Sequence, residues 1–277
     1  MIFTDKFVYV HEPKTGGTFV THVLRRIHFG ERESTEAKPQ TSSRFSLKLL
    51  PRRSRESHPH QATYGTLTIG EHKHATASEI PPEHRDKVIL ATVRNPYDLY
   101  VSEFEFGWWR KPSFRKDFRD LPGFHTTYSH FPNLSFEEYV RFINPDPEKV
   151  YLRPDGTPAP GVGAFSKRFV KFYCKSPQDA LRRLGDGYIA SEQYREDLYE
   201  IRFIATDRLN EELYRFLLEM GYREPDIAFI PDLGRIRPSD SRRGDDQRWE
   251  EYYTPELKRL VRERERMLFT LFPQFDL

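Results

Sequence analysis

The chain lacks several sequence features that would by themselves point to a class of function. Its 277 residues contain a single cysteine, Cys174, which excludes an intrachain disulfide and a Cys-x-x-Cys metal or redox motif. We interpret Cys174 as a small buried residue, in keeping with a reducing compartment. No stretch approaches the roughly 20 apolar residues of a membrane helix. The N-terminus enters a predicted strand by Phe7 and does not resemble a basic leader followed by an apolar segment.

Neither positive nor negative charge is in large excess. The chain carries 44 basic and 42 acidic residues, a formal net charge of +2, so we expect no nucleic-acid partner. Its apolar residues make up 37% and its aromatic residues 14%, which is enough for one sizeable α/β core. We predict a single domain over residues 1–277, with a polar surface insert at about 31–66 and a second insert at about 108–170.

The most informative segment lies near the N-terminus, where an apolar, β-branched run breaks into a short loop and resumes with helical spacing. The loop comprises Pro13, Lys14, Thr15, Gly16, Gly17 and Thr18. This pattern predicts a strand, a tight loop and a helix. Glycines without a Cβ let main-chain N–H groups approach phosphate oxygens at the positive end of the helix. Lys14 would add a cation, with Thr15 and Thr18 as hydroxyl donors at the same rim, although Gly-Gly after a strand is also an ordinary turn.

A second segment combines a strand pattern with polar residues at its end. Residues 88–93 are a continuous apolar run, typical of a strand buried on both faces, and Arg94 follows. Pro96 suits the first turn of a helix that would carry Ser102. Arg94 and Ser102 could then contact one phosphate. Taken singly, Arg94 could equally be an ion-pair residue and Ser102 a solvated helix serine.

Further elements follow along the chain. We predict helices at 135–143, where Ser135 and Glu138 form a capping box, at 176–184, at 206–218 and from 253 through 269, with a strand at 199–205. Strands that alternate with helices imply an α/β fold with a central, mainly parallel sheet flanked by helices.

Together the two segments resemble a known family. The loop at 13–18 resembles the 5′-phosphosulfate loop of sulfotransferases, and the residues from Arg94 to Ser102 resemble their 3′-phosphate-binding element. The likeness is to the membrane-associated carbohydrate sulfotransferases and their soluble bacterial relatives. It implies a P-loop-like sulfotransferase fold that uses 3′-phosphoadenosine 5′-phosphosulfate (PAPS), leaves 3′-phosphoadenosine 5′-phosphate (PAP) and needs no metal. The cofactor contacts it implies are Pro13, Lys14, Thr15, Gly16, Gly17, Thr18, Phe19, Arg94, Ser102 and, from a C-terminal loop, Arg242 and Arg243.

The resemblance also implies the reaction. A sulfuryl group would pass from PAPS to a hydroxyl of an acceptor, with a carbohydrate as the favoured acceptor and the insert at about 108–170 on the acceptor side. Lys14 would meet the charge that grows on the leaving oxygen. An acceptor hydroxyl needs a base, for which His74 is the closer match and ranks above His72, followed by Glu71 and Glu12. The pair His72 and His74 is also a weak metal pattern, but it has no third ligand nearby.

Two other classes of protein stay open from the residues alone. A small-molecule kinase or other nucleotide phosphotransferase would need a G-x-x-x-x-G-K-[ST] loop and an acidic magnesium site, which we do not find. A nucleotide-binding scaffold without catalysis would not need Lys14 and His74. For the sulfotransferase we favour a cytoplasmic, bacterial protein over a trimmed lumenal domain of the Golgi.

Overall fold

A single sheet organises the chain. The computed structural model describes residues 1–30, 64–112, 124–144, 161–234, 236, 244 and 247–276. Within them, five strands lie in the order β3-β1-β2-β4-β5. Their bounds are β1 Ile2–Phe3, β2 Phe7–Val10, β3 Thr68–Ile69, β4 Val88–Val93 and β5 Ile201–Ala205. β2, β4 and β5 are parallel, whereas β1 pairs antiparallel with β2 and β3. The predicted mainly parallel sheet is confirmed for the three long strands, and the two-residue strands β1 and β3 are too short to leave a sequence pattern.

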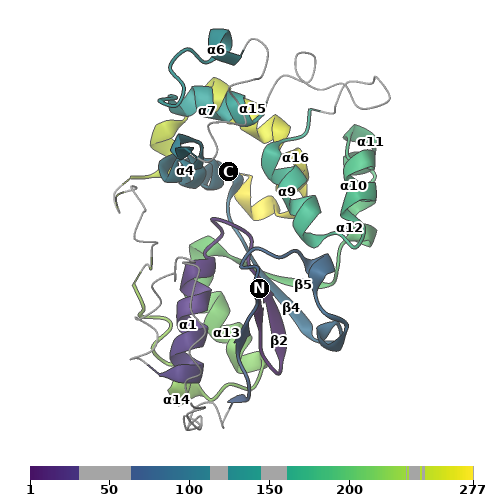
Figure 1. Cartoon of the computed structure of the whole chain (residues 1–277), viewed down its shortest axis with the longest axis vertical. Coiled ribbons are helices and arrows are strands. Elements are labelled where there is room, and N and C mark those ends of the chain that lie inside the picture. The colour runs from purple at the N-terminus through teal and green to yellow at the C-terminus, as the bar shows by residue number, and fades with distance from the viewer. Residues whose placement is uncertain are drawn as a thin grey trace, which may run out of the picture.

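Helices cover both faces of the sheet. One group comprises α1 (Gly17–Phe29), α13 (Leu209–Glu219) and α14 (Glu224–Ile227). The other comprises α4 (Pro96–Phe106), α7 (Phe136–Ile143), α9 (Ala164–Tyr173), α10 (Pro177–Arg183), α15 (Pro255–Arg264) and α16 (Arg266–Leu271). Shorter helices are α6 (Phe124–Thr127), α11 (Asp186–Ala190) and α12 (Tyr194–Asp197). Figure 1 shows the first group in the lower part of the molecule, with α4, α7, α9, α15 and α16 in the upper part.

Alternation along the strands divides the interior into two cores. Phe7 and Tyr9 of β2 pack with α1 and α13, whereas Val8 and Val10 pack with the other group of helices. β4 alternates in the same way, so both faces of the strand are buried. This confirms the prediction from its continuous apolar run. The fold is therefore a three-layer α/β/α arrangement whose middle layer carries the two loops of interest.

Local signals set the helices next to these loops. The apolar residues of α1 recur at helical spacing and face the core, and the helix ends at Gly30, whose φ of 86° suits glycine. α4 begins after Asn95, whose side chain accepts a hydrogen bond from the N–H of Tyr97 at 2.9 Å, and ends at Gly107. The capping box that we predict at Ser135 and Glu138 is present at the start of α7.

The predicted final helix is broken, and the break has a structural role. α15 and α16 meet at Glu265, which leaves helical geometry with φ −98° and ψ 22° and is completely buried. Its carboxylate accepts hydrogen bonds from the Tyr100 hydroxyl at 2.6 Å and from the N–H groups of Phe165 and Ser166 at 3.0 and 2.7 Å. The Ser166 hydroxyl donates a fourth bond at 2.7 Å. A carboxylate at the first turn of α9 satisfies N–H groups that have no partner within that helix.

The inserts that we predict fall partly outside the described residues. Of the segment at about 31–66 only the last three residues are described. In the described part of 108–170, Trp109 is fully buried and stacks on Tyr139 of α7, with ring centroids 4.4 Å apart. Trp109 is therefore a core residue and not a surface for a sugar ring. Cys174 is free and buried, as predicted. Among the described helices, none combines the length and apolar character needed to cross a bilayer.

We predict that Glu265→Ala lowers the free energy of unfolding by about 3 kcal/mol or more, because four buried donors lose their acceptor. Urea denaturation would measure this loss. The matched control is Glu263→Ala, two residues earlier and exposed, for which we expect a change within about 0.5 kcal/mol. Equal stability of the two variants would contradict the role assigned to the Glu265 carboxylate.

Candidate phosphate-binding site

The parallel pairing of β2 and β4 brings the two predicted loops together. Val10 lies opposite Ala91, so both strands end at the same edge of the sheet. Nη1 of Arg94 donates to the carbonyl of Lys14 and to Oγ of Ser102, both at 3.0 Å. Nε of Arg94 donates to Asp98 at 2.7 Å. The arginine thus contacts the N-terminal loop and the helix α4 at the same time.

The loop between β2 and α1 has its carbonyl groups held by partners from several elements. Each carbonyl from residue 11 to residue 16 accepts a hydrogen bond, and five of the six partners are side chains. In chain order the pairs of acceptor and donor are His11 with His74, Glu12 with Thr15, Pro13 with Arg168, Lys14 with Arg94, Thr15 with Thr206, and Gly16 with the N–H of Phe19.

The N–H groups that follow are in a different situation. Among the described residues, the N–H groups of Gly17 and Thr18 have no hydrogen-bond acceptor. They open α1, so the positive end of its dipole lies at the same place. Lys14 and Gly16 both have positive φ, at 66° and 98°, and a turn of this kind with adjacent free N–H groups is suited to an anion. The residues present therefore fit a phosphate group.

The two glycines are needed for packing. A Cβ on Gly17 would lie 1.9 Å from Nε2 of His11, and a Cβ on Gly16 would lie 2.8 Å from Cδ2 of Leu209. We expect from the sequence that these glycines leave room for a ligand. In the structure, neighbouring side chains occupy this space. The absence of a Cβ on the two glycines allows His11 and Leu209 to pack directly against the loop.

Two predicted contacts change their character in the structure. The side chain of Thr15 is buried, and its hydroxyl donates to the Glu12 carbonyl at 2.9 Å and lies 2.8 Å from the hydroxyl of Thr92. We expect from the sequence that the Thr15 hydroxyl is a donor at the rim of the loop, and this expectation is wrong. Only the main chain of Thr15 can face a ligand. Phe19, in the first turn of α1, is buried in the core, and its N–H donates to the carbonyl of Gly16. Phe19 thus faces the interior and not the loop.

The side chain of Lys14 crosses toward the end of α4. Its Nζ lies over the ring of Phe106, 4.2 Å from the centroid, a cation–π contact. Phe106 is the last residue of the helix that carries Ser102. The ammonium group and the Arg94 guanidinium are therefore both directed to the side of the loop where α4 lies.

The candidate bases differ in their contacts with the loop. Nδ1 of His74 lies 3.0 Å from the His11 carbonyl, and the two rings are 4.8 Å apart. A carbonyl can only accept, so Nδ1 carries the proton and Nε2 keeps its lone pair. Partial burial lowers the pKa of His74 below its ordinary 6.5, the bond to His11 opposes this shift, and Lys73 acts in the same direction as burial. His74 is therefore uncharged near neutral pH and adjoins the loop.

The side chain of His72 is exposed, and its charge lowers the pKa of Glu79. Glu71 is exposed as well. His11, which we did not rank as a base, is buried between the loop and His74, and burial followed by the proximity of His74 and Lys73 lowers its pKa to about 2. Its role is to pack against Gly17 as a neutral ring.

A buried ion-pair network lies under the loop. Glu12 is 3% exposed, and its carboxylate pairs with Nε of Arg168 at 2.8 Å. Nη1 of Arg168 pairs with Glu103 at 2.6 Å. Burial raises the pKa of Glu12, and Arg168 opposes the rise. For Arg168, burial would lower the pKa, but the two carboxylates outweigh it and the pKa is raised. Glu12 is thus committed to Arg168 and is not placed to act as a base.

Sequence reasoning missed Arg168 and Thr206. The hydroxyl of Thr206 donates to the carbonyls of Thr15 and Val93, at 3.1 and 2.7 Å, and so joins the loop to the end of β4. The only local signal is position, since Thr206 directly follows β5. Arg168 lies in α9, which contains no acidic residue that would mark it as an ion-pair partner.

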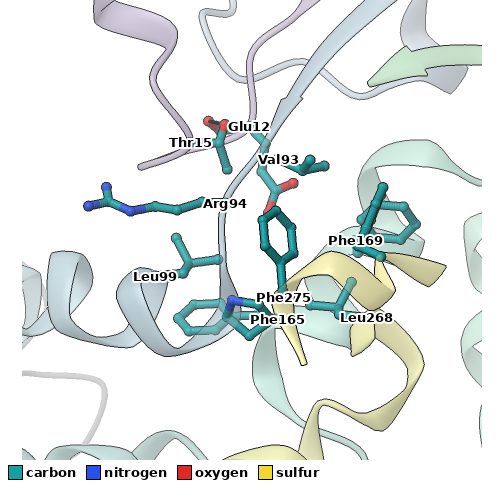
Figure 2. A pocket seen from close by; sticks show the side chains of 11 residues that line it. Glu12, Thr15, Val93, Arg94, Leu99, Phe165, Phe169, Leu268 and Phe275 are labelled. Atoms are coloured by element: carbon teal, nitrogen blue, oxygen red, sulfur yellow. Dashed lines mark hydrogen bonds between the residues drawn. The ribbon is translucent and has the colours of Figure 1, made fainter. Parts of the chain in front are cut away.

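A small cavity lies beside the loop on the side of α9 and α16. It is lined mainly by apolar residues that include Val93, Phe165, Phe169 and Leu268, and its volume of about 20 Å³ is close to that of one water. Figure 2 shows the Arg94 side chain extending away from the aromatic side chains of this cavity. The cavity is too small for a nucleotide, and neither Gly17 nor Thr18 lines it.

Two predicted contacts are not described. Arg242 and Arg243 lie outside the described residues. Within those residues, no group of three or more His, Cys, Asp or Glu side chains has the geometry of a metal site.

Comparisons with known proteins add one structural similarity. No family model matches the chain, and no curated protein matches it. The chain is similar to the crystal structure of the mouse sulfotransferase SULT7A1 complexed with PAP, at 14% identity and a TM-score of 0.44, over 94% of this chain and 82% of that chain.

We predict that Gly17→Ala destabilises the protein by about 1–3 kcal/mol, because the new methyl group overlaps the buried ring of His11. Urea denaturation would measure the change. The matched control is Gly187→Ala in α11, where an added Cβ meets nothing within 4 Å, and we expect that variant to be as stable as the wild type or slightly more stable. A Gly17→Ala protein of unchanged stability would contradict the close packing of His11.

Proposed function

We propose that the protein is a sulfotransferase that transfers a sulfuryl group from PAPS to a hydroxyl of an acceptor. The observation that carries the proposal is the contact of one guanidinium, that of Arg94, with both the Lys14 carbonyl and the Ser102 hydroxyl. The two segments that resemble the phosphate-binding elements of sulfotransferases therefore meet at one point. A ligand with phosphate groups at both ends of an adenosine is the class of molecule that such a pair of elements would hold.

The roles divide between the two elements. The N–H groups of Gly17 and Thr18, at the positive end of α1, would bind the 5′-phosphate. Arg94 and Ser102 would bind the 3′-phosphate, and the contact of Arg94 with Asp98 holds the guanidinium in orientation. This second contact distinguishes PAP and PAPS from AMP, which has no 3′-phosphate.

Lys14 and His74 would carry the chemistry. Sulfuryl transfer breaks the bond from sulfur to the bridging oxygen of the nucleotide and forms a bond from sulfur to the acceptor oxygen. The Lys14 ammonium would stabilise the charge that grows on the bridging oxygen. Nε2 of His74 would take the proton of the acceptor hydroxyl, for which its lowered pKa keeps it in the basic form near neutral pH.

A carbohydrate is the acceptor that we propose, on the resemblance of the two motifs to carbohydrate sulfotransferases. A hydroxyl of a sugar is a weak nucleophile that needs a base. The accessibility of His74, whose side chain is exposed beside the loop, supports an acceptor that approaches from solvent.

We expect calorimetric titration to give PAP an affinity at least about 100-fold higher than that of AMP, since two charge-assisted contacts to the 3′-phosphate are added. ATP, with or without magnesium, should bind no more tightly than AMP. Arg94→Ala should remove most of the preference for PAP. The matched control is Arg85→Ala, because Arg85 bonds the Ile80 carbonyl and not the loop. Preferred binding of magnesium ATP would instead favour a phosphotransferase.

A transfer assay separates the two histidines. With radiolabelled PAPS and a panel of unsulfated polysaccharides, we expect His74→Asn to reduce the transfer rate by about 10²- to 10⁴-fold, the usual contribution of a general base. His72→Asn is the matched control and should keep activity within about threefold. Lys14→Ala sets the lower limit of the assay, because it removes the proposed stabilising charge. Full activity of His74→Asn would sink the assignment of the base.

A further inference from the structure

Arg168 of α9 makes three contacts, with two consecutive residues of the loop after β2 and with one residue of α4. Nε donates to Glu12 at 2.8 Å, Nη1 to Glu103 at 2.6 Å and Nη2 to the carbonyl of Pro13 at 3.1 Å. Glu103 directly follows Ser102 in α4. One side chain therefore joins α9 to the loop between β2 and α1 and to the helix that carries Ser102. All three nitrogens donate to protein acceptors.

The third contact lies next to the strained residue of the loop. Lys14 has a φ of 66°, a left-handed conformation that costs a non-glycine residue of order 1 kcal/mol or more. The carbonyl before Lys14 is held by Arg168 and the carbonyl of Lys14 itself by Arg94. Two arginines thus fix the peptide groups on either side of the proposed catalytic lysine. Because the C=O and N–H of a trans peptide point in opposite directions, holding the carbonyl also sets the N–H.

We propose that Arg168 is a positioning residue that holds the Pro13–Lys14 peptide in the conformation required to bind the 5′-phosphate end of the nucleotide. The inference rests on the proposed function, because it concerns the same loop. According to this proposal, α9, which is distant from the loop in the sequence, affects the binding of the 5′-phosphate end only. The contact with Pro13 is made by Nη2, whereas the pairing with Glu103, next to Ser102 at the other end, is made by Nη1.

The strength of the ion pairs does not by itself explain Arg168. A buried ion pair often adds little net stability, because desolvation offsets the attraction. A guanidinium is suited to this position because its planar fork can donate to two carboxylates and a carbonyl at once, which an ammonium cannot do in the same geometry. Arg168→Lys keeps the positive charge between Glu12 and Glu103 and removes the fork. This variant therefore tests the geometry separately from the charge.

The experiment compares PAP with adenosine 3′-phosphate, which lacks the 5′-phosphate. Both ligands are titrated calorimetrically into the wild type, into Arg168→Lys and into the control Arg262→Lys, whose arginine makes two bonds to Asp276 and none to the loop. We expect Arg168→Lys to raise the Kd of PAP by about tenfold and that of adenosine 3′-phosphate by no more than about twofold. Arg262→Lys should change neither. A loss of folded protein alone would affect both ligands equally.

A second variant guards against a folding failure. In Glu12→Gln, Arg168→Met, Glu103→Gln the network is replaced by neutral side chains of similar size, which leaves no unpaired buried charge. It should show the same selective loss of PAP affinity. If either folded variant binds PAP as tightly as the wild type, or loses both ligands equally, the positioning role is overturned while the proposed function stands. If the wild type binds no PAP, the proposed function fails first and the inference falls with it.

Discussion

The site depends on the parallel alignment of β2 with β4, because this pairing sets where two loops distant in the sequence end. With Val10 opposite Ala91, the loop that follows β2 and the turn that follows β4 leave the sheet at the same edge. A guanidinium on the second turn can then reach a carbonyl of the first. A shift of one residue in this register would turn every side chain of β4 to the other face, and the two buried cores hold it in place.

On this frame the loop is organised by its carbonyl groups. Three of the donors come from other elements: Arg94 from the turn between β4 and α4, Arg168 from α9, and Thr206 from the end of β5. Each donates a hydrogen bond to one carbonyl of the loop. A main-chain carbonyl near a bound phosphate would repel it, so fixing these groups on protein donors removes an unfavourable contact before any ligand arrives. What is left at the start of α1 is N–H groups and a helix dipole, which is electrostatic preorganisation.

The sequence predicted those parts of the structure whose causes are local. The strand β4, the helix α4 with Asn95 and Pro96 at its start, and the capping box of α7 follow from spacing and from turn residues close together in the chain. The meeting of Arg94 with the loop follows from the parallel pairing of β2 and β4, which end at the same edge of the sheet. Arg168 and Thr206 could not be found in this way, because their acceptors lie 155 and 191 residues away. The break at Glu265 was missed for the same reason, since its donors lie in α4 and α9.

The conformation of Lys14 links these long-range contacts to the proposed role of its ammonium group. At a positive φ the Cβ leaves the main chain in a different direction from that of an ordinary loop residue. From there the side chain runs to Phe106 at the end of α4, where the ammonium rests over the ring. The direction of the lysine is therefore set by its main chain, which Arg94 and Arg168 hold on both sides. If the loop were free to relax, Lys14 would leave its positive φ and its ammonium group would no longer point to the end of α4. The hydrogen bonds to six consecutive carbonyls prevent this relaxation.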